Sequence, residues 1–408
     1  MFINGLCSPL MNLEELFGYG IVSTGRVPVG GTHARCRYGS PDYFVNLHKR
    51  AAAAHLRDSS GRGTGPRPAR EIRNKRITMP RYGFNFLWMY VWGPDRKPQP
   101  PDQKALDFMA AYDFNFVRIP TDYRFWITDF DYLHPNEAVF DYFDRYLEDC
   151  RARGFHMSLN LHRAPGYCIN RNDLERDNLW VDQIAQDAFV FQWETFARRY
   201  RGVPNEFLSF DLLNEPPNVG QYGLTRENHA ALMRRTVAAI RAIDPAREIV
   251  IDGLGGGHLA MPELVDVDVI HSGRGYQPMP VSHYQAQWWS GHADAPPPVY
   301  PGVEWEGRVW NRETLREFYQ PWRDVEAAGA TVHIGECGCY NKTPNDVALR
   351  WLGDLFGLYK EFGWGFALWN FKGDFGIVEH GRPGARYEKL HGYNVDRELL
   401  DVILNSRV

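Results

Sequence analysis

The chain has 408 residues, a length that suits one large domain or two to three average ones. Hydrophobic residues make up 44% and charged residues 24%, which excludes a fibrous or wholly disordered protein. A net charge of −4 favours neither nucleic acid nor an anionic membrane as a partner. No apolar run approaches the ~18 residues of a membrane span, and Glu14 and Glu15 stand where the apolar part of a signal peptide would lie. We therefore expect a cytoplasmic protein.

Charge is unevenly distributed along the chain. Residues 1–80 contain 12 Lys and Arg against 5 Asp and Glu, a net charge of +7, which leaves −11 for the remaining 328 residues. The stretch 51–80 is rich in Gly, Pro and Arg and cannot bury enough apolar surface to offset its ordering entropy. We expect residues 1–78 to be a loosely ordered basic extension and residues 79–408 to be the domain. A nucleic-acid-binding arm, or a true start at Met79, are the alternatives.

From residue 79 onward, short apolar runs alternate with stretches of helical periodicity, which is typical of βα units around a parallel sheet. The apolar runs are nearly unbroken, as expected for strands buried on both faces. The predicted strands are Tyr82–Leu87, Asn115–Ile119, His156–Leu161, Phe207–Leu213, Glu248–Asp252, Val267–His271, Thr331–Gly335 and Gly365–Trp369. Helices are clearest where Phe189, Trp193, Phe196 and Tyr200, and then Met233, Val237 and Ile240, recur at helical spacing. Eight strands in about 330 residues predict a single (β/α)8 barrel, or TIM barrel, with a doubly wound sheet as the alternative.

Polar side chains follow five of the predicted strands. They are Arg118 at the second, His162 at the third, Asn214 and Glu215 at the fourth, Glu336 at the seventh and Trp369 at the eighth. The carboxyl ends of the strands meet at one rim of a barrel, and a charge beside a buried apolar run costs several kcal/mol unless it is paired or solvated. The sequence therefore predicts one functional site at this rim.

Two carboxylates at such a rim indicate glycoside cleavage. One carboxyl must stay protonated to protonate the leaving oxygen, and the other must be ionised to attack or stabilise the oxocarbenium-like centre. Arg118 would favour the ionised form of a neighbouring carboxyl. Asn214 can bind a sugar 2-hydroxyl, and Trp369 offers a flat apolar face to the sugar ring.

On these motifs, residues 79–408 resemble glycoside hydrolase family 5, the cellulase family of retaining (β/α)8 glycosidases. The resemblance implies that Glu215 in LLNEPP is the acid/base and that Glu336 in HIGECG is the nucleophile. It further implies that Arg118 in FVRIP orients the nucleophile, that His162 in LNLHRAPGY lines the site, and that Trp369 in ALWNFKGDFG lies under the sugar. No metal or other cofactor is implied.

One position departs from the family pattern. The sixth strand of the family usually ends His-x-Tyr, and here the run reads Arg274-Gly-Tyr276. Tyr276 can still donate a hydrogen bond to the nucleophile, and His283 in the following loop is a candidate to replace the missing histidine. The cation at Arg274 indicates an unusual substrate group or a different subfamily.

The resemblance and the two carboxylates together predict a double displacement. Glu336 attacks the anomeric carbon while Glu215 protonates the departing oxygen, and Glu215 then activates water. We expect the two carboxyl groups to lie roughly 5 Å apart.

Substrate preference is less strongly indicated. The connection after the sixth strand carries aromatic residues that suit stacking on sugars, although half of them are expected to pack the loop onto the barrel: Tyr284, Trp288, Trp289, Tyr300, Trp305 and Trp310. We expect a β-linked oligosaccharide or polysaccharide substrate, preferably soluble β-gluco-oligosaccharides. β-Mannosides and glycolipids are the alternatives.

The sequence leaves two competing functions open. Gly255, Gly257 and Ala260 fit the dinucleotide-binding pattern G-x-G-x-x-A, but Asp266 and Asp268 follow earlier than the ~20 residues that this pattern requires. A non-catalytic carbohydrate-binding barrel is the second alternative, supported only by the departure at Arg274.

Overall fold

The structure, a computed structural model, describes residues 80–408 except 91, 290 and 292–295. The predicted extension 1–78 and the alternative start at Met79 lie outside the described residues.

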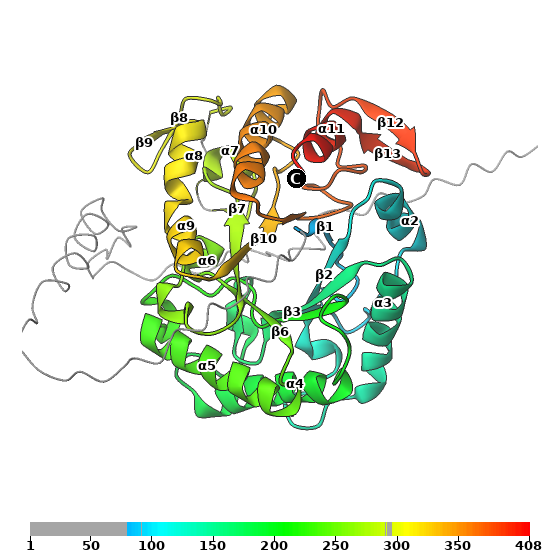
Figure 1. Cartoon of the computed structure of the whole chain (residues 1–408), viewed down its shortest axis with the longest axis vertical. Helices are drawn as coiled ribbons and strands as arrows, with labels where there is room; N and C mark the ends of the chain where they lie inside the picture. Colours follow the sequence, from blue (N-terminus) through cyan, green and yellow to red (C-terminus); the bar gives the residue numbers. More distant parts are fainter. Residues whose placement is uncertain (1–79, 91, 290, 292–295) are drawn as a thin grey trace, which may run out of the picture. The chain divides into compact units, whose positions relative to one another are not determined.

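Eight parallel strands form a closed barrel at the centre of the described chain (Figure 1). They hydrogen-bond in the order β2-β1-β11-β10-β7-β6-β5-β3, and β3 pairs with β2 to close the ring. The strands are β1 (Tyr82–Asn85), β2 (Phe116–Asp122), β3 (His156–Ala164), β5 (Leu208–Asp211), β6 (Glu248–Asp252), β7 (Ile270–Gly275), β10 (Thr331–Cys337) and β11 (Phe366–Leu368). This confirms the predicted (β/α)8 barrel and excludes the open, doubly wound sheet.

Every predicted strand overlaps an observed one, and the largest difference concerns the sixth. The prediction of 267–271 was wrong at both ends, because β7 starts at Ile270 and runs to Gly275. Both Gly273 and Gly275 lie inside the strand, because the pairing with β10 continues to Gly275 opposite Cys337. A Cβ atom at Gly275 would lie 2.5 Å from the Cβ of Cys337, so the glycine permits close packing within the strand.

Helices surround the barrel (Figure 1). They are α2 (Gln103–Ala111), α3 (Phe140–Ala152), α4 (Gln183–Arg199), α5 (Arg226–Ile243), α6 (Leu254–Gly257), α7 (Met279–Ser282), α8 (Arg312–Phe318), α9 (Gln320–Ala327), α10 (Asn345–Phe362) and α11 (Arg397–Asn405). The apolar residues that predicted α4 and α5 are buried against the barrel. Thr225 and Asn228 form a capping box at the start of α5, and this helix ends at Ile243.

Short strands and 3-10 turns connect or extend the elements of the barrel. Strand β4 (Tyr167–Cys168) adds antiparallel to β3, and the hairpins β8–β9 (Val303–Trp305, Arg308–Trp310) and β12–β13 (Tyr387–Leu390, Tyr393–Asp396) stand apart from the barrel sheet. The 3-10 turns are η2 (Tyr123–Phe125), η3 (Glu137–Val139), η4 (Asn172–Leu174), η5 (Gln221–Gly223) and η6 (Pro262–Leu264). Among the described helices, none combines the length and apolarity that crossing a bilayer requires.

Candidate active site

Four charged side chains meet at the carboxyl ends of the barrel strands. Arg118 comes from β2, Arg274 from β7 and Glu336 from β10, and Glu215 follows β5. Arg118, Arg274 and Glu336 are at most 3% exposed, whereas the side chain of Glu215 is 16% exposed. The parallel register of the strands thus brings together the residues that the sequence placed at separate strand ends.

Glu336 accepts hydrogen bonds from three side chains. Its Oε1 atom lies 2.5 Å from Nη1 of Arg118 and 3.4 Å from Nη2 of Arg274. Its Oε2 atom accepts from the Tyr276 hydroxyl at 3.1 Å. Two guanidinium groups therefore compensate the charge of this buried carboxylate, and the hydroxyl fixes its orientation.

Glu215 is held mainly through its backbone. Its amide donates to Oδ2 of Asp252 at 3.1 Å, and its carbonyl accepts from the Tyr167 hydroxyl at 2.7 Å. These bonds support a left-handed conformation with φ of 46°, which costs of order 1–3 kcal/mol for a residue other than glycine. The side chain receives one hydrogen bond, from Nε of Arg274 at 2.8 Å.

The surroundings of Glu215 favour its protonated form. Burial and the nearby charge of Glu336 raise the pKa of the Glu215 carboxyl to about 7, although Arg274 opposes the shift. This value is suitable for a group that must give up and regain a proton near neutral pH.

Asn214 connects the charged residues to His162. Its Oδ1 atom accepts from Nη2 of Arg118 at 3.1 Å and from Nη2 of Arg274 at 2.9 Å. Its Nδ2 atom lies 3.3 Å from Nε2 of His162. Burial and the neighbouring arginines hold the pKa of His162 well below its ordinary value, so the imidazole is neutral and accepts from the amide.

Aromatic rings form a second wall. The His162 ring stacks on the half-buried Trp369 with centroids 5.2 Å apart and an interplanar angle of 23°. The Tyr90 ring stands edge-on to both, 4.4 Å from His162 and 5.8 Å from Trp369. An apolar face next to buried hydrogen-bonding groups is suitable for a sugar ring.

Several residues at this site were missed by the sequence analysis. Asp211 accepts from Nε of Arg118 at 2.6 Å, and Asn85 accepts from Nη1 of the same arginine at 3.0 Å. Burial raises the pKa of Asp211 to about 6 against the effect of Arg118. Asp252 and Tyr90 were also missed. Three of the four are polar residues inside predicted strands, a signal that could have identified them.

Arg274 and His283, the two residues that the sequence singled out around the sixth strand, do not lie where the sequence suggested. Arg274 is fully buried and its nitrogens face protein groups, so the structure does not support its contact with an unusual substrate group. His283 lies behind Tyr276, with ring centroids 5.1 Å apart, and its Nδ1 atom is 2.8 Å from Oγ of Ser282. Among the described residues, no hydrogen bond or ion pair joins His283 to Glu336 or Glu215, and its contact with the site runs through the Tyr276 ring.

The loop aromatics divide into two groups, as expected. Tyr284, Tyr300 and Trp310 are buried and pack the loop onto the barrel. Trp288 is 39% exposed, and the half-buried Trp289 and Trp305 contact each other edge-on at 5.5 Å.

The glycine-rich segment that suggested nucleotide binding lacks the required helix. Gly255, Gly256 and Gly257 all have positive φ, and α6 comprises only four residues. Asp266 pairs with the exposed Arg234. A dinucleotide fingerprint needs a full helix whose N-terminus faces the pyrophosphate, so this interpretation was wrong.

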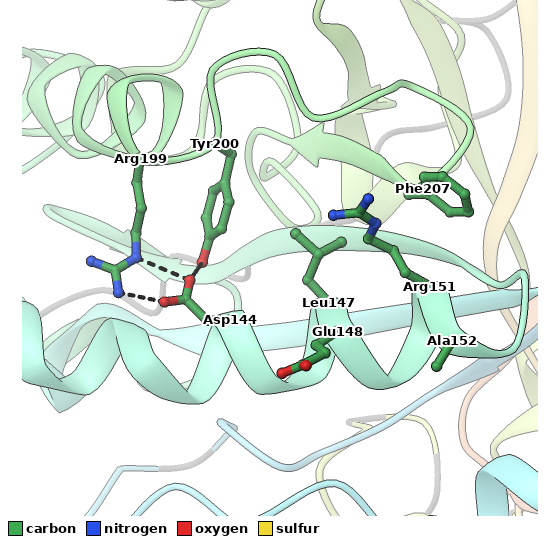
Figure 2. A pocket seen from close by; sticks show the side chains of 8 residues that line it. All are labelled: Asp144, Leu147, Glu148, Arg151, Ala152, Arg199, Tyr200 and Phe207. Carbon is green, nitrogen blue, oxygen red and sulfur yellow. Dashed lines mark hydrogen bonds and ion pairs between the residues drawn. The ribbon is translucent and has the colours of Figure 1, made fainter.

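A hollow of about 720 Å³ lies on the outside of the barrel (Figure 2). It is lined by Asp144, Leu147, Glu148, Arg151 and Ala152 of α3, by Arg199 and Tyr200 at the end of α4, and by Phe207 before β5. Arg199 and Tyr200 bind Asp144, and Arg151 lies over the Phe207 ring (Figure 2). Because Phe207 precedes β5 and Glu215 follows it, this hollow belongs to the opposite end of the strand.

Comparison with known proteins agrees with this geometry. The chain is 30% identical over 317 residues to endoglucanase C of Acetivibrio thermocellus, covering 71% of this chain and 89% of the relative. It is 25% identical over 253 residues to cellodextrinase A of Ruminococcus flavefaciens, covering 60% and 70%. The crystal structure of a glycoside hydrolase superposes with a TM-score of 0.80 at 68% identity, covering 81% of this chain and 100% of that one.

The match to a family extends over most of the barrel. Residues 74–374 match cellulase (glycosyl hydrolase family 5). Together with the endoglucanase relative and the closed barrel, this match identifies the reaction class as hydrolysis of β-glycosidic bonds, with a β-glucan or an oligosaccharide as substrate. The chain belongs to the cellulase family, glycosyl hydrolase family 5, and is a β-glycoside hydrolase.

Proposed function

We propose that this enzyme is a retaining β-glucanase that cleaves β-gluco-oligosaccharides and soluble β-glucans, with Glu336 as the nucleophile and Glu215 as the acid/base. The observation that carries the proposal is the unequal environment of the two carboxyls. Glu336 accepts from Arg118, Arg274 and Tyr276, whereas the pKa of Glu215 is raised to about 7. The names of two relatives, endoglucanase C and cellodextrinase A, support a glucan substrate.

In the first step, Oε2 or Oε1 of Glu336 attacks the anomeric carbon and the glycosidic bond breaks. Glu215 transfers its proton to the departing oxygen, so the leaving sugar departs as a neutral alcohol. The product of this step is a glycosyl ester on Glu336, with Glu215 now ionised.

In the second step, Glu215 accepts a proton from water, whose oxygen attacks the anomeric carbon on the face that the leaving group vacated. The ester bond to Glu336 breaks, and the proton that Glu215 gained restores the acid. Two inversions retain the anomeric configuration.

The remaining residues bind the sugar. Trp369 offers a flat apolar ring face, and Asn214 offers an amide proton beside Glu215 to the 2-hydroxyl. His162 fixes both, because it stacks on Trp369 and accepts from Asn214. Nothing in these steps calls for a metal or an organic cofactor.

The test is hydrolysis of a panel of cello-oligosaccharides, manno-oligosaccharides, aryl β-glycosides and a glucosylated lipid by the full chain, with the anomer of the first product read by proton NMR. We expect cellotetraose to be cleaved fastest and the β-anomer to form first. Faster cleavage of manno-oligosaccharides would favour a mannanase, and an α-anomer would exclude the double displacement. Cleavage of a glucosylated lipid alone would favour a glycolipid glycosidase. The cytoplasmic location stays a prediction, which fractionation of the source cells would test.

A further inference from the structure

One guanidinium group contacts three carboxylates at the centre of the site. Arg274 donates from Nε to Glu215 at 2.8 Å and from Nη2 to Glu336 at 3.4 Å. It also binds Asp252 with two nitrogens, one of them Nη1 at 3.1 Å. A single side chain therefore bridges both proposed catalytic carboxyls and is itself anchored on a third.

Arg274 is fixed in this place. Arg274 and Asp252 are both fully buried, and Nη1 also donates to the Gly273 carbonyl at 3.1 Å. The stem passes so close to the glycine-rich segment that a Cβ atom at Gly257 would lie 2.4 Å from Cγ of Arg274. The absence of a side chain at Gly257 therefore leaves room for the Arg274 stem, and this role does not involve nucleotide binding.

The charge around Arg274 changes during the proposed reaction. The double displacement requires an ionised Glu336 and a protonated Glu215 before the first step. In the glycosyl-enzyme Glu336 is a neutral ester, and Glu215 is ionised. The negative charge therefore moves from one partner of Arg274 to the other, while Asp252 keeps its charge throughout because Arg274 and Arg118 hold its pKa below the ordinary value despite burial.

We propose that Arg274, anchored by Asp252, is a positioning residue that couples the two carboxyls, compensating the charge of Glu336 before glycosylation and that of Glu215 after it. This proposal rests on the proposed double displacement. It adds that one cation, Arg274, assists both the formation and the hydrolysis of the glycosyl-enzyme.

Other groups also act on these two residues. The titratable groups around Glu215 are Arg274, Glu336, Asp252, Tyr276 and Tyr167. Those around Arg274 further include Arg118, Asp211, His162, His258, His333 and Cys337. Burial lowers the pKa of the three histidines, so they stay neutral near pH 7. On Glu215, Arg274 has a larger effect than Asp252 and the opposite sign. Removing the pair together should therefore raise the pKa of Glu215.

The test is the double variant Arg274→Met/Asp252→Asn, which removes the ion pair without leaving a buried charge unpaired. For cellotetraose, kcat/KM requires protonated Glu215, and we expect its basic limb to move up by about 1 pH unit. For 2,4-dinitrophenyl β-cellobioside, whose leaving group needs no proton, kcat requires ionised Glu215 in the glycosyl-enzyme. We expect the acidic limb of that kcat to move up by about the same amount.

Two further variants separate charge from geometry. Arg274→Lys keeps the cation but not the planar fork, so we expect its pH limbs to stay nearer to wild type while its kcat falls. The matched control is Arg234→Met/Asp266→Asn, which removes an exposed Arg–Asp pair and should leave both limbs and kcat unchanged.

Circular dichroism and thermal melting would first establish that each variant folds. If the wild type hydrolyses both substrates but the Arg274→Met/Asp252→Asn variant loses rate with both limbs unmoved, Arg274 supports the structure only and the coupling is wrong. If the wild type hydrolyses neither substrate, the proposed function fails first. Should the double variant not fold, Arg274→Lys with both limbs and kcat equal to wild type would overturn the inference.

Discussion

The surroundings of Glu336 and of Glu215 differ although both are glutamates at the same rim. Glu336 lies within β10, is 3% exposed and accepts from two arginines and a tyrosine. Glu215 follows β5 on a strained backbone and accepts from one arginine, with Asp252 next to its amide. The number of donors around a carboxyl, rather than its residue type, thus indicates which of the two attacks and which exchanges a proton.

The largest loss of activity should come from replacing Glu336, the carboxyl with three hydrogen-bond donors. Replacing Glu336 with Gln removes the attacking oxygen but keeps the shape, so we expect cellotetraose turnover to fall on the order of 10⁵-fold. The melting temperature should change little, because Asp211 and Asp252 still pair with the two arginines. A Glu336→Gln enzyme that retained a tenth of its activity would reverse our assignment.

A smaller and more selective loss is expected at Glu215. Glu215→Ala should slow cellotetraose hydrolysis by roughly 10²–10⁴-fold. Glycosylation by 2,4-dinitrophenyl β-cellobioside needs no acid and should persist. Added azide should then speed turnover and yield a glycosyl azide, detectable by mass spectrometry, whose β-anomeric configuration proton NMR would establish. Absence of azide rescue, or an α-azide, would contradict an acid/base on the face that the leaving group vacates.

The pH profile of the wild type measures the same difference between the two carboxyls. With a pKa raised to about 7, the Glu215 carboxyl keeps its proton below this pH and loses it above. Because glycosylation requires the proton, kcat/KM for cellotetraose should fall about tenfold per pH unit on the alkaline side. Initial rates from pH 5 to 9 would test this, and a limb below pH 5 would exclude a raised pKa.

Much of this site was predictable from the sequence, because strands buried on both faces leave unbroken apolar runs. The polar residues that follow these runs lie at the carboxyl ends of the strands, where a barrel carries its functional site. Glu215, Glu336 and Arg118 were found in this way. Asp252 ended a predicted strand and could have been found by the same rule, but no motif singled it out. Its importance depends on which strands are neighbours, and in this sheet β6 lies between β5, which precedes Glu215, and β7, which carries Arg274.

The sixth strand shows where local patterns fail. The predicted strand stopped at His271, before Gly273 and Gly275, which left Arg274 beyond the strand, and its cation was interpreted as a sign of an unusual substrate group or a different subfamily. In the barrel those glycines accommodate Ile334 and Cys337 of β10, and Arg274 lies within the sheet. Only tertiary packing reveals that a glycine serves a close approach rather than a turn.

The smallest effect is expected from placing a methyl group at Gly257, in the space that the Arg274 stem occupies. Gly257 and Gly202 have nearly the same φ, 80° and 81°, but nothing lies within 4 Å of a Cβ atom at Gly202. Replacing either with Ala should cost about 1 kcal/mol of unfolding free energy through backbone strain. Gly257→Ala should cost a further ~1–3 kcal/mol, because the methyl group overlaps the arginine stem.

Urea denaturation of the two variants would give this difference directly, and activity would show its consequence. We expect Gly202→Ala to keep wild-type kcat, whereas Gly257→Ala should lower kcat because a displaced Arg274 stem shifts the guanidinium away from Glu215. Equal stability and equal kcat in the two variants would mean that Arg274 tolerates displacement. The environment of Glu215 would then depend on the rest of the site, and the contrast with Glu336 would no longer rest on this arginine.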